Sequence, residues 1–389
     1  MREAVIVAAA RTPVGRCRGV LAPVPVEELG AIACKEAVKR SGVDPKEIDE
    51  VIFSNLMGHN INNMGRMVAL QAGLPLTVPG ISLDRQCGAS LTGFAYATMA
   101  IQTGYADVMV AGGVESDSRR NYVMDKPVAP YQVMPPQWSK VVTCPPEYGQ
   151  DSMVQTADNL AEKYGLTREE CDAFAAESHK KADAAQKAGH FDSQIVPVEV
   201  KERKGSYVVD KDECVRPEST VESLGKLRTV QKGDGYYVTT AGNSSPMSDG
   251  AGAVVVMEKE KAKAMGLEIL GTMKAYASAG VEPRIMGIGP YYATKKLLEK
   301  SGMTLGDIDL IEMNEAFAAQ SLSVLKEIDF DRDKLNVNGG AISLGHPLAG
   351  TGAILLTKML YELKRRDLST GLVTFCCGGG MGVSVVIER

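Results

Sequence analysis

Two cysteines and a histidine lie at positions in the sequence that suit catalytic residues. Cys87 follows a strand predicted over Ile81-Ser82-Leu83 and precedes a helix predicted from Leu91 to Gln102, so it should lie near a helix N-terminus. Backbone N–H groups and the helix dipole stabilise a thiolate there, and the thiolate is the nucleophilic form of cysteine. The alternative is a buried cysteine that acts as a small apolar side chain.

His346 is the candidate base to pair with Cys87. It lies in a glycine-rich stretch over residues 338–352, where a ligand can approach the backbone closely. Such a placement suits a histidine that accepts a proton from a nucleophile, whereas the alternative is a histidine that caps a turn. The other histidines are weaker candidates: His59, and His179 and His190, which lie on or beside a charged helix.

Cys376 and Asn314 each follow an apolar run that reads as a buried strand. Cys376 precedes Gly378-Gly379-Gly380, and consecutive small residues can turn several N–H groups toward one point, as an oxyanion hole requires. A phosphate cradle is the weaker alternative, because the Lys-Ser/Thr of a P-loop is missing and no helix opens there. Asn314 stands where open α/β sheets bind ligands and could hold a water or an oxyanion, with a helix N-cap as the alternative.

A faint internal repeat predicts the elements that position these residues. Ser41-Gly42 and Ile48-Asp49 recur in register as Ser301-Gly302 and Ile308-Asp309, a period of about 260 residues. A helical pattern precedes each of these short repeated motifs, and an apolar run follows it. In both copies there then come a turn of small residues that begins a helix and a strand that ends in glycines. A period this long indicates a duplicated domain.

Alternating strands and helices in each copy predict an α/β fold with mainly parallel sheets and helices on both faces. If the copies pack about a pseudo-twofold axis, Cys87 and His346 would face each other, because they occupy matching places in the repeat. The pattern breaks over residues 118–246, which are proline-rich from Pro127 to Pro146 and then form an amphipathic helix from Arg168 to Ala188. We interpret this stretch as a ligand-contacting insertion.

The predicted division has three parts: residues 1–117 with 247–269 form the N-terminal half, 118–246 an inserted loop domain, and 270–389 the C-terminal half. Composition supports a folded globular chain, with 44% hydrophobic and 23% charged residues among 389. A net charge of −5 without a long basic block argues against nucleic acid as a partner.

No apolar stretch approaches 18 residues and the N-terminus lacks a signal-peptide pattern, so we expect no membrane association and a cytoplasmic location. The eight cysteines form no CxxC pair, so we expect thiols. We expect no metal site, because no histidines or cysteines share a ligand-type spacing apart from the adjacent Cys376 and Cys377.

Taken together, the motifs resemble those of the thiolase family over essentially the whole chain. They are, in order, Arg85-Gln86-Cys87-Gly88-Ala89-Ser90, Asn314-Glu315-Ala316-Phe317-Ala318, Asn338-Gly339-Gly340-Ala341-Ile342-Ser343-Leu344-Gly345-His346-Pro347, and Cys376-Cys377-Gly378-Gly379-Gly380-Met381-Gly382. The resemblance implies a layered α-β-α-β-α arrangement of the duplicated α/β domains, with an inserted loop domain.

The resemblance also implies roles for the candidate residues. Cys87 would attack an acyl-CoA thioester and carry the acyl group, His346 would activate Cys87, and Cys376 would move the proton at the acetyl α-carbon. His346 and a water held by Asn314 would stabilise the enolate, and the N–H groups of Cys87 and Gly378 would stabilise the tetrahedral intermediate. The implied reaction is reversible condensation of acetyl-CoA with an acyl-CoA, or cleavage of a 3-oxoacyl-CoA by CoA, with acetoacetyl-CoA as the short substrate.

Coenzyme A would then be a co-substrate, with no permanently bound cofactor. The resemblance places these residues along it: Arg216, Ser245, Ala316, Phe317 and Met153. One position departs from the family, because Ser152 stands where many short-chain members have a histidine. The preferred acyl length and the choice between homodimer and tetramer stay open.

Two alternative functions predict different residues at these positions. A ketoacyl-synthase-like condensing enzyme would have a second histidine or an asparagine in place of Cys376. A non-catalytic acyl-CoA-binding relative would have lost a catalytic side chain. All four are present in this sequence: Cys87, Asn314, His346 and Cys376.

Overall fold

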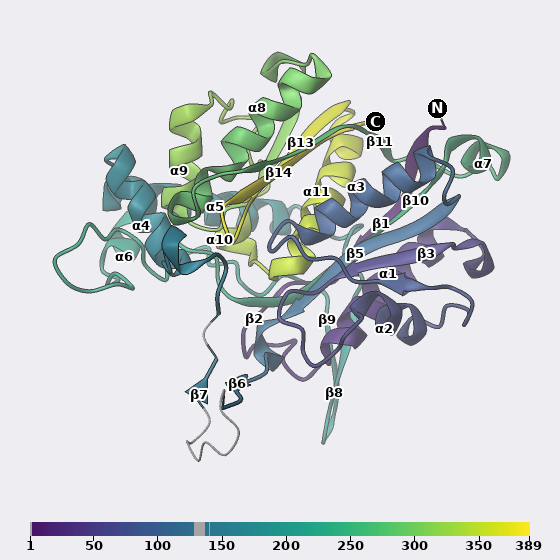
Figure 1. Cartoon of the computed structure of the whole chain (residues 1–389), viewed down its shortest axis with the longest axis horizontal. Coiled ribbons are helices and arrows are strands. Elements are labelled where there is room, and N and C mark those ends of the chain that lie inside the picture. The colour runs from purple at the N-terminus through teal and green to yellow at the C-terminus, as the bar shows by residue number, and fades with distance from the viewer. Residues whose placement is uncertain (1, 128–136, 140) are drawn as a thin grey trace.

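A ten-stranded mixed sheet runs through the protein (Figure 1). The structure is a computed structural model that describes residues 2–127, 137–139 and 141–389, so part of the proline-rich stretch, residues 128–136 and 140, lies outside the described residues. The strands follow the order β12 (Leu310–Met313), β13 (Thr370–Cys377), β14 (Met381–Glu388), β11 (Gly271–Gly280), β1 (Ala4–Arg11), β10 (Ser248–Glu258), β5 (Val108–Ser116), β3 (Glu50–Ser54) and β4 (Gly80–Ile81), with β2 (Gly15–Arg16) paired to β10.

Strand direction differs from the sequence-based expectation. The prediction of mainly parallel sheets is wrong, because only β3 with β4 and β5, and β12 with β13, pair in parallel among the named strands. The remaining pairs are antiparallel; β13 and β14, for instance, are joined by a tight turn that reverses the chain. The predicted strand at Ile81-Ser82-Leu83 is also shorter than expected and ends at Ile81.

The duplication predicted from the sequence is confirmed by topology. The strand order β3-β5-β10-β1 in one half matches β12-β13-β14-β11 in the other, with β4 as an additional edge strand in the first half. The two half-sheets join through two residue pairs between β1 and β11. In both halves an aspartate at the same repeat position accepts two backbone hydrogen bonds from the start of a strand. Asp49 accepts from residues 107 and 108, and Asp309 accepts from residues 369 and 370.

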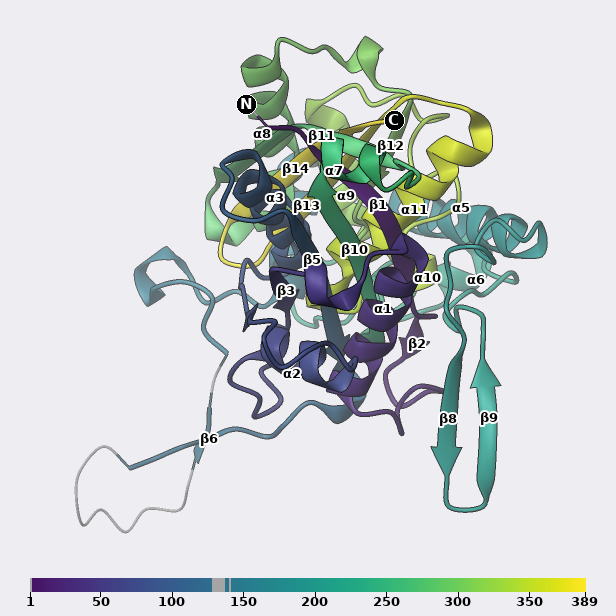
Figure 2. The ribbon, with the colours of Figure 1, turned by 90° about the vertical axis from the view of Figure 1, so that its right-hand side faces the viewer.

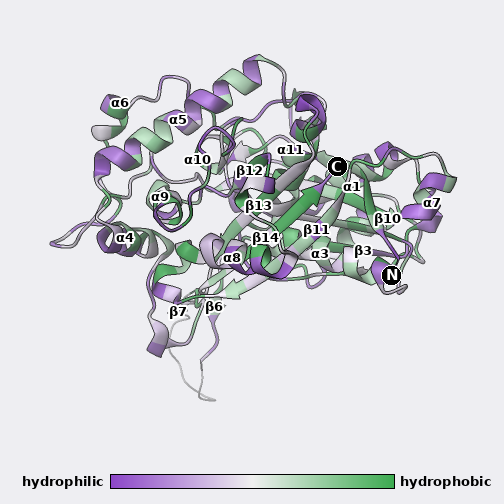
Figure 3. Cartoon of the chain, turned by 90° about the horizontal axis from the view of Figure 1, so that it is seen from above, coloured by the Kyte–Doolittle hydropathy of each residue, from purple (hydrophilic) through white to green (hydrophobic). Residues whose placement is uncertain are grey.

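Helices and half-sheets alternate in five layers, as expected (Figure 1). The outer layers are α1 (Val26–Ser41) with α2 (Met64–Gln71) and α8 (Gly289–Ser301) with α9 (Ala318–Glu327); the central layer is α3 (Ala89–Gln102) with α11 (Thr351–Arg366). Three buried clusters fill the spaces between the layers. Helix α3 is apolar on nearly all sides, which suits a helix enclosed between two sheets, and Figure 3 shows apolar residues gathered on it and on the strands.

Residues 118–246 add no strand to the central sheet within their described part. They form the small pairs β6 (Met124–Asp125) with β7 (Gln137–Trp138) and β8 (Val198–Glu202) with β9 (Gly205–Val209), and the helices α4 (Met153–Tyr164), α5 (Arg168–Lys187) and α6 (Val221–Gly225). The β8–β9 hairpin projects from the body (Figure 2). Two short helices complete the set, α7 (Lys259–Ala264) and α10 (Ala341–Leu344); no helix among the described residues is long and apolar enough to cross a membrane.

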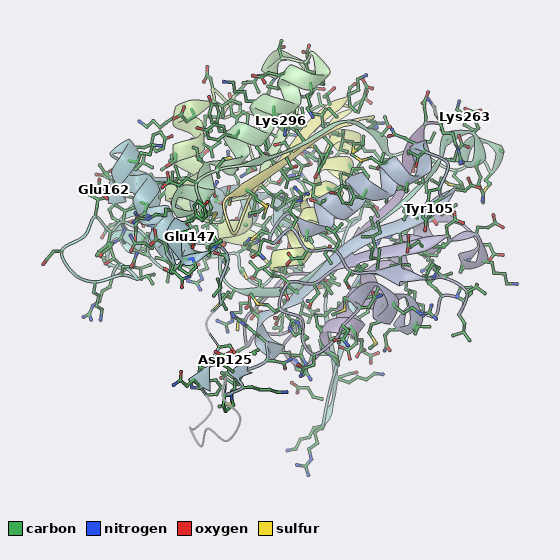
Figure 4. The ribbon with its side chains drawn as sticks, in the orientation of Figure 1. Tyr105, Asp125, Glu147, Glu162, Lys263 and Lys296 are labelled. Atoms are coloured by element: carbon green, nitrogen blue, oxygen red, sulfur yellow. The ribbon has the colours of Figure 1, made fainter. Side chains whose placement is uncertain are left out.

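A buried ion pair ties the inserted segment to the first strand. Most charged side chains lie at the surface, as Glu162, Lys263 and Lys296 do in Figure 4. Arg11 and Asp212, by contrast, have side chains only 1% and 0% exposed. Their two hydrogen bonds are 2.8 and 2.9 Å long, and Asp212 also accepts from the backbone N–H of Val14. This pair therefore fixes the segment that leads to Arg216.

We predict that Asp212→Asn lowers the free energy of unfolding by about 3–5 kcal/mol, because Arg11 would stay buried without a counter-charge. Chemical denaturation followed by far-UV circular dichroism measures this loss. Glu222→Gln, which removes the exposed ion pair with Lys226, is the matched control and should leave the unfolding midpoint unchanged. Equal effects of the two substitutions would show that the buried pair does not hold the segment.

Candidate active site

Cys87 lies on a tight turn at the start of α3. Gln86 has φ +51°, a strained value for a residue with a side chain, and the turn is closed by a 3.2 Å hydrogen bond from the Gly88 N–H to the Arg85 carbonyl. A Cβ on Gly88 would lie 2.7 Å from the Cys377 sulfur, so this position requires glycine. The turn thus presses the Cys87 backbone against the end of β13.

The electrostatics of Cys87 differ from the expected thiolate. Burial raises its pKa to about 12, while hydrogen bonds from the N–H groups of Gly378 and of Cys87 itself act in the opposite direction and the charge of Glu115 raises it further. Desolvation therefore outweighs the helix N-terminus. The resting side chain is therefore a neutral thiol.

Cys376 lies at the end of β13, beside the turn that leads into β14. Gly379 and Gly380 have φ +82° and +84°, a left-handed conformation that other residues adopt with strain. The turn points the Gly378 N–H at the Cys87 sulfur. Burial raises the pKa of Cys376 well above its usual value, and the charge of Cys87 raises it further, which places the two sulfurs in one site.

His346 lies in the turn between α10 and α11 and is 4% exposed. Its Nδ1 lies 2.7 Å from the Thr351 hydroxyl, and that hydroxyl also lies 3.0 Å from the Pro347 carbonyl. The hydroxyl has one proton to donate to the carbonyl, so it accepts from the His346 Nδ1–H and leaves Nε2 with a lone pair. Burial lowers the pKa of His346 to about 4, which keeps the ring neutral and able to act as a base.

Asn314 follows β12 and contacts His346 on the side of the ring that carries Nε2. Its Nδ2 lies 3.3 Å from the His346 Nε2, in agreement with a lone pair on that nitrogen. Its Oδ1 is buried without a hydrogen-bond partner in the described structure, so one polar atom remains for a ligand or water. Asn314 does not cap α9, whose N-cap residue is Phe317, and the helix-cap alternative is therefore wrong.

The N-termini of the two central helices meet beside these residues. The Ser90 hydroxyl of α3 accepts a 3.0 Å hydrogen bond from the Ala353 N–H of α11, and a Cβ on Gly352 would lie 2.5 Å from the Leu91 nitrogen. The loops that carry Cys87 and His346 precede these helices. The two helices that follow these loops therefore meet at their N-termini, as the repeat predicts for the loops.

The expected CoA contacts fall into two groups. Met153, Ala316 and Phe317 pack around Cys376 together with Met286, whereas Arg216 lines a separate cavity that is open to solvent. Two adjacent serines connect the groups. Ser244 lines the cavity, and the Ser245 hydroxyl and N–H each donate a 3.0 Å hydrogen bond to the Ala316 carbonyl.

Ser152, the position that departs from the family pattern, has a local structural role. It is the N-cap of α4, and its hydroxyl accepts a 3.2 Å hydrogen bond from the Gln155 N–H. An N-cap serine satisfies a free backbone donor and so helps α4 begin at Met153. The substitution therefore keeps Met153 at the edge of the apolar cluster around Cys376.

Sequence reasoning missed three side chains of the site. Thr351 orients His346, Met286 packs against Cys376, and His179 lines the cavity beside Arg216. Thr351 could have been suspected from its place five residues after His346 at the start of a helix. No local pattern marks Met286 or His179, because their partners are distant in the sequence.

Comparison with known proteins agrees with this geometry. Residues 4–260 match the family "Thiolase, N-terminal domain", and residues 267–389 match "Thiolase, C-terminal domain". An acetyl-CoA acetyltransferase of Pseudomonas aeruginosa is 46% identical over the full length of both chains. The acetyl-CoA acetyltransferase of Bacillus anthracis has a TM-score of 0.95 at 44% identity, covering 100% of this chain and 99% of that one. Human mitochondrial 3-ketoacyl-CoA thiolase has a TM-score of 0.94 at 37% identity with the same coverage.

Matches to both halves, identity over the whole length and the shared fold together show that this chain belongs to the thiolase family.

Proposed function

We propose that the protein is an acetyl-CoA acetyltransferase that condenses acetyl-CoA with an acyl-CoA and runs the same reaction in reverse. The observation that carries the proposal is the proximity of the half-buried Cys87 to the buried Cys376, with the Gly378 N–H directed at the Cys87 sulfur. One nucleophile that holds an acyl group and one base that acts on a neighbouring carbon are what a thioester condensation needs.

The first step is acyl transfer to Cys87. The sulfur attacks the thioester carbonyl while its proton passes to the His346 Nε2, and the CoA thiolate leaves and takes that proton. A neutral histidine with a pKa lowered to about 4 and a neutral thiol suit this concerted transfer. The N–H groups of Cys87 and Gly378, which already face the sulfur, would bind the oxyanion of the tetrahedral intermediate.

In the second step Cys376 first passes its proton to the His346 Nε2, and the resulting thiolate takes an α-proton from a second acetyl-CoA. The enolate carbon then attacks the acyl group on Cys87, and the Cys87 thiolate leaves to give a 3-oxoacyl-CoA. Asn314, whose Oδ1 has no partner among the described residues, would hold a water at the enolate oxygen. The His346 Nε2, now carrying the proton from Cys376, would donate there and then return that proton to the Cys87 thiolate. Charge stabilisation of this kind is needed because a thioester α-proton is a very weak acid.

We place CoA along the inserted loop domain, for which residues 118–246 are the proposed bounds. Its pantetheine would pass Ser245 and Ala316, with the acyl end against Met153 and Phe317, and its nucleotide would reach Arg216. CoA acts here as a co-substrate and not as a resident cofactor. We also propose a homodimer or tetramer, supported by apolar side chains exposed on neighbouring elements: Met67, Leu70, Ile81, Tyr96 and Met99.

A broad 3-ketoacyl-CoA thiolase is the second candidate. It is favoured by Ser152, because a serine at the start of α4 leaves more room near Met153 than a histidine would.

Substrate preference tests the proposal. We expect CoA-dependent loss of the enolate absorbance of acetoacetyl-CoA with kcat/KM at least about tenfold higher than for 3-oxo-octanoyl-CoA, because an apolar pocket discriminates on added methylenes. Equal or better cleavage of the longer substrate would support the broad thiolase. Cleavage of neither would contradict the proposed reaction.

We predict that Cys87→Ser lowers kcat by at least about a thousandfold, as replacement of a covalent nucleophile does, while CoA still binds. Intact mass spectrometry after incubation with acetyl-CoA should show an acetyl adduct on the wild type and none on the variant. Cys17→Ser, at a partly buried cysteine outside the proposed catalytic machinery, is the control and should keep both adduct and rate. An undiminished rate in Cys87→Ser would remove Cys87 from the nucleophile role.

For Cys376→Ala we predict normal acetylation of Cys87 but condensation and cleavage slowed by about 10²- to 10⁴-fold, the usual contribution of a general base. Exchange of the acetyl-CoA α-protons with deuterated water should be lost in parallel. Acetylation in the same variant is the internal control for an intact site. A variant that fails to acetylate would assign Cys376 to the earlier step.

A further inference from the structure

His179 is a buried histidine that the proposed chemistry does not use. It lies in α5, is 4% exposed, and accepts a 3.1 Å hydrogen bond at Nδ1 from the backbone N–H of Arg216. Because Nδ1 is the acceptor, the neutral ring carries its proton on Nε2. His179 thus has a defined tautomer, and it binds a backbone segment that is far from it in the sequence.

His179 also lines the solvent-open cavity that Arg216 borders. Polar groups from several elements share this lining: Arg16, Ser219, Ser244 and Glu213. Arg16 is paired with Glu213 at 3.0 Å, whereas the exposed Arg216 side chain forms no ion pair within the described part of the chain. The cavity therefore offers one uncompensated positive charge to an anionic ligand.

The charge state of His179 is fixed by its surroundings. Burial lowers its pKa to about 4, the positive charge of Arg216 lowers it further, and Glu218 acts weakly in the opposite direction. Above pH 5 the ring is neutral, so Nδ1 stays available to accept from the Arg216 N–H. Protonation would replace that acceptor with a second donor facing the same N–H.

We propose that His179 is a positioning residue for CoA: it fixes the Arg216 backbone so that the guanidinium meets the phosphates of the nucleotide end, and its Nε2–H adds a donor to the same cavity. This inference rests on the proposed use of CoA. It assigns His179 no part in the chemistry at Cys87, since the nucleotide end is remote from the thioester. The expected signature is a change in KM without a change in kcat.

The test compares CoA thioesters with thioesters of pantetheine, which lack the nucleotide. We expect His179→Ala to raise KM for CoA by at least about tenfold with kcat within about twofold, because a buried hydrogen bond and the placement of a charge are lost. With acetoacetyl-pantetheine, wild type and variant should behave alike. Lys180→Asn, an exposed change on the same helix, is the matched control and should behave as wild type.

Two further variants separate positioning from general packing. His179→Asn puts an amide oxygen near the place of Nδ1 and should restore most of the CoA affinity. Arg216→Ala combined with His179→Ala should be no worse than Arg216→Ala alone if the histidine acts mainly through Arg216. Equal losses with CoA and pantetheine thioesters, a fall in kcat at unchanged KM, or full additivity would each overturn the proposal.

Direct binding keeps this inference separate from the proposed function. Titration calorimetry with CoA measures affinity without turnover, so a wild type that cleaves no thioester would contradict the proposed reaction and still allow the comparison. Weaker CoA binding by His179→Ala, with recovery in His179→Asn, supports the inference. CoA binding by His179→Ala as tight as that of wild type overturns it.

Discussion

The close packing of the two central helices is the constraint on which the site depends. A Cβ on Gly352 would lie 2.5 Å from the Leu91 nitrogen, and Ser90 accepts a hydrogen bond from Ala353, so backbone meets backbone where α3 and α11 begin. Loops that precede two touching helix N-termini must end at the same place. The duplicated topology therefore brings the loops that carry Cys87 and His346 to neighbouring helix ends.

The same packing determines the protonation states in the site. Burial raises the pKa of Cys87 to about 12 and lowers that of His346 to about 4, so each group rests in its neutral form. A standing thiolate would be easily oxidised, whereas a neutral thiol becomes nucleophilic only when a base receives its proton. The Gly378 N–H opposes the desolvation locally, where negative charge is formed during the reaction. Rigid enclosure thus favours the transition state over the resting ion.

Local patterns in the sequence predict the elements well but not their directions or partners. The helix expected from Arg168 is α5, and the helices that follow Cys87 and His346 meet at their N-termini, at matching places in the repeat. Antiparallel strands that are buried on both faces, as β1, β10 and β14 are, show the continuous apolar pattern typical of parallel strands, which explains the wrong sheet prediction. The prediction of a thiolate at Cys87 was wrong because a helix N-terminus can be inferred from a sequence, whereas the depth at which a side chain is buried cannot. Thr351 depends on a contact that only the folded chain creates.

Helix α5 connects residues 118–246 to the candidate active site. The described part of this segment adds no strand to the central sheet. Two adjacent residues on α5 face different parts of the active region. Ser178 donates a 2.6 Å hydrogen bond to Glu315 and accepts one from the Gly340 N–H, in the loop that leads to His346, while His179 accepts from Arg216. One rigid helix therefore sets the distance between the catalytic loop and the cavity. A ligand that spans both would meet two ends of a single preorganised unit, and no domain movement is required to align them.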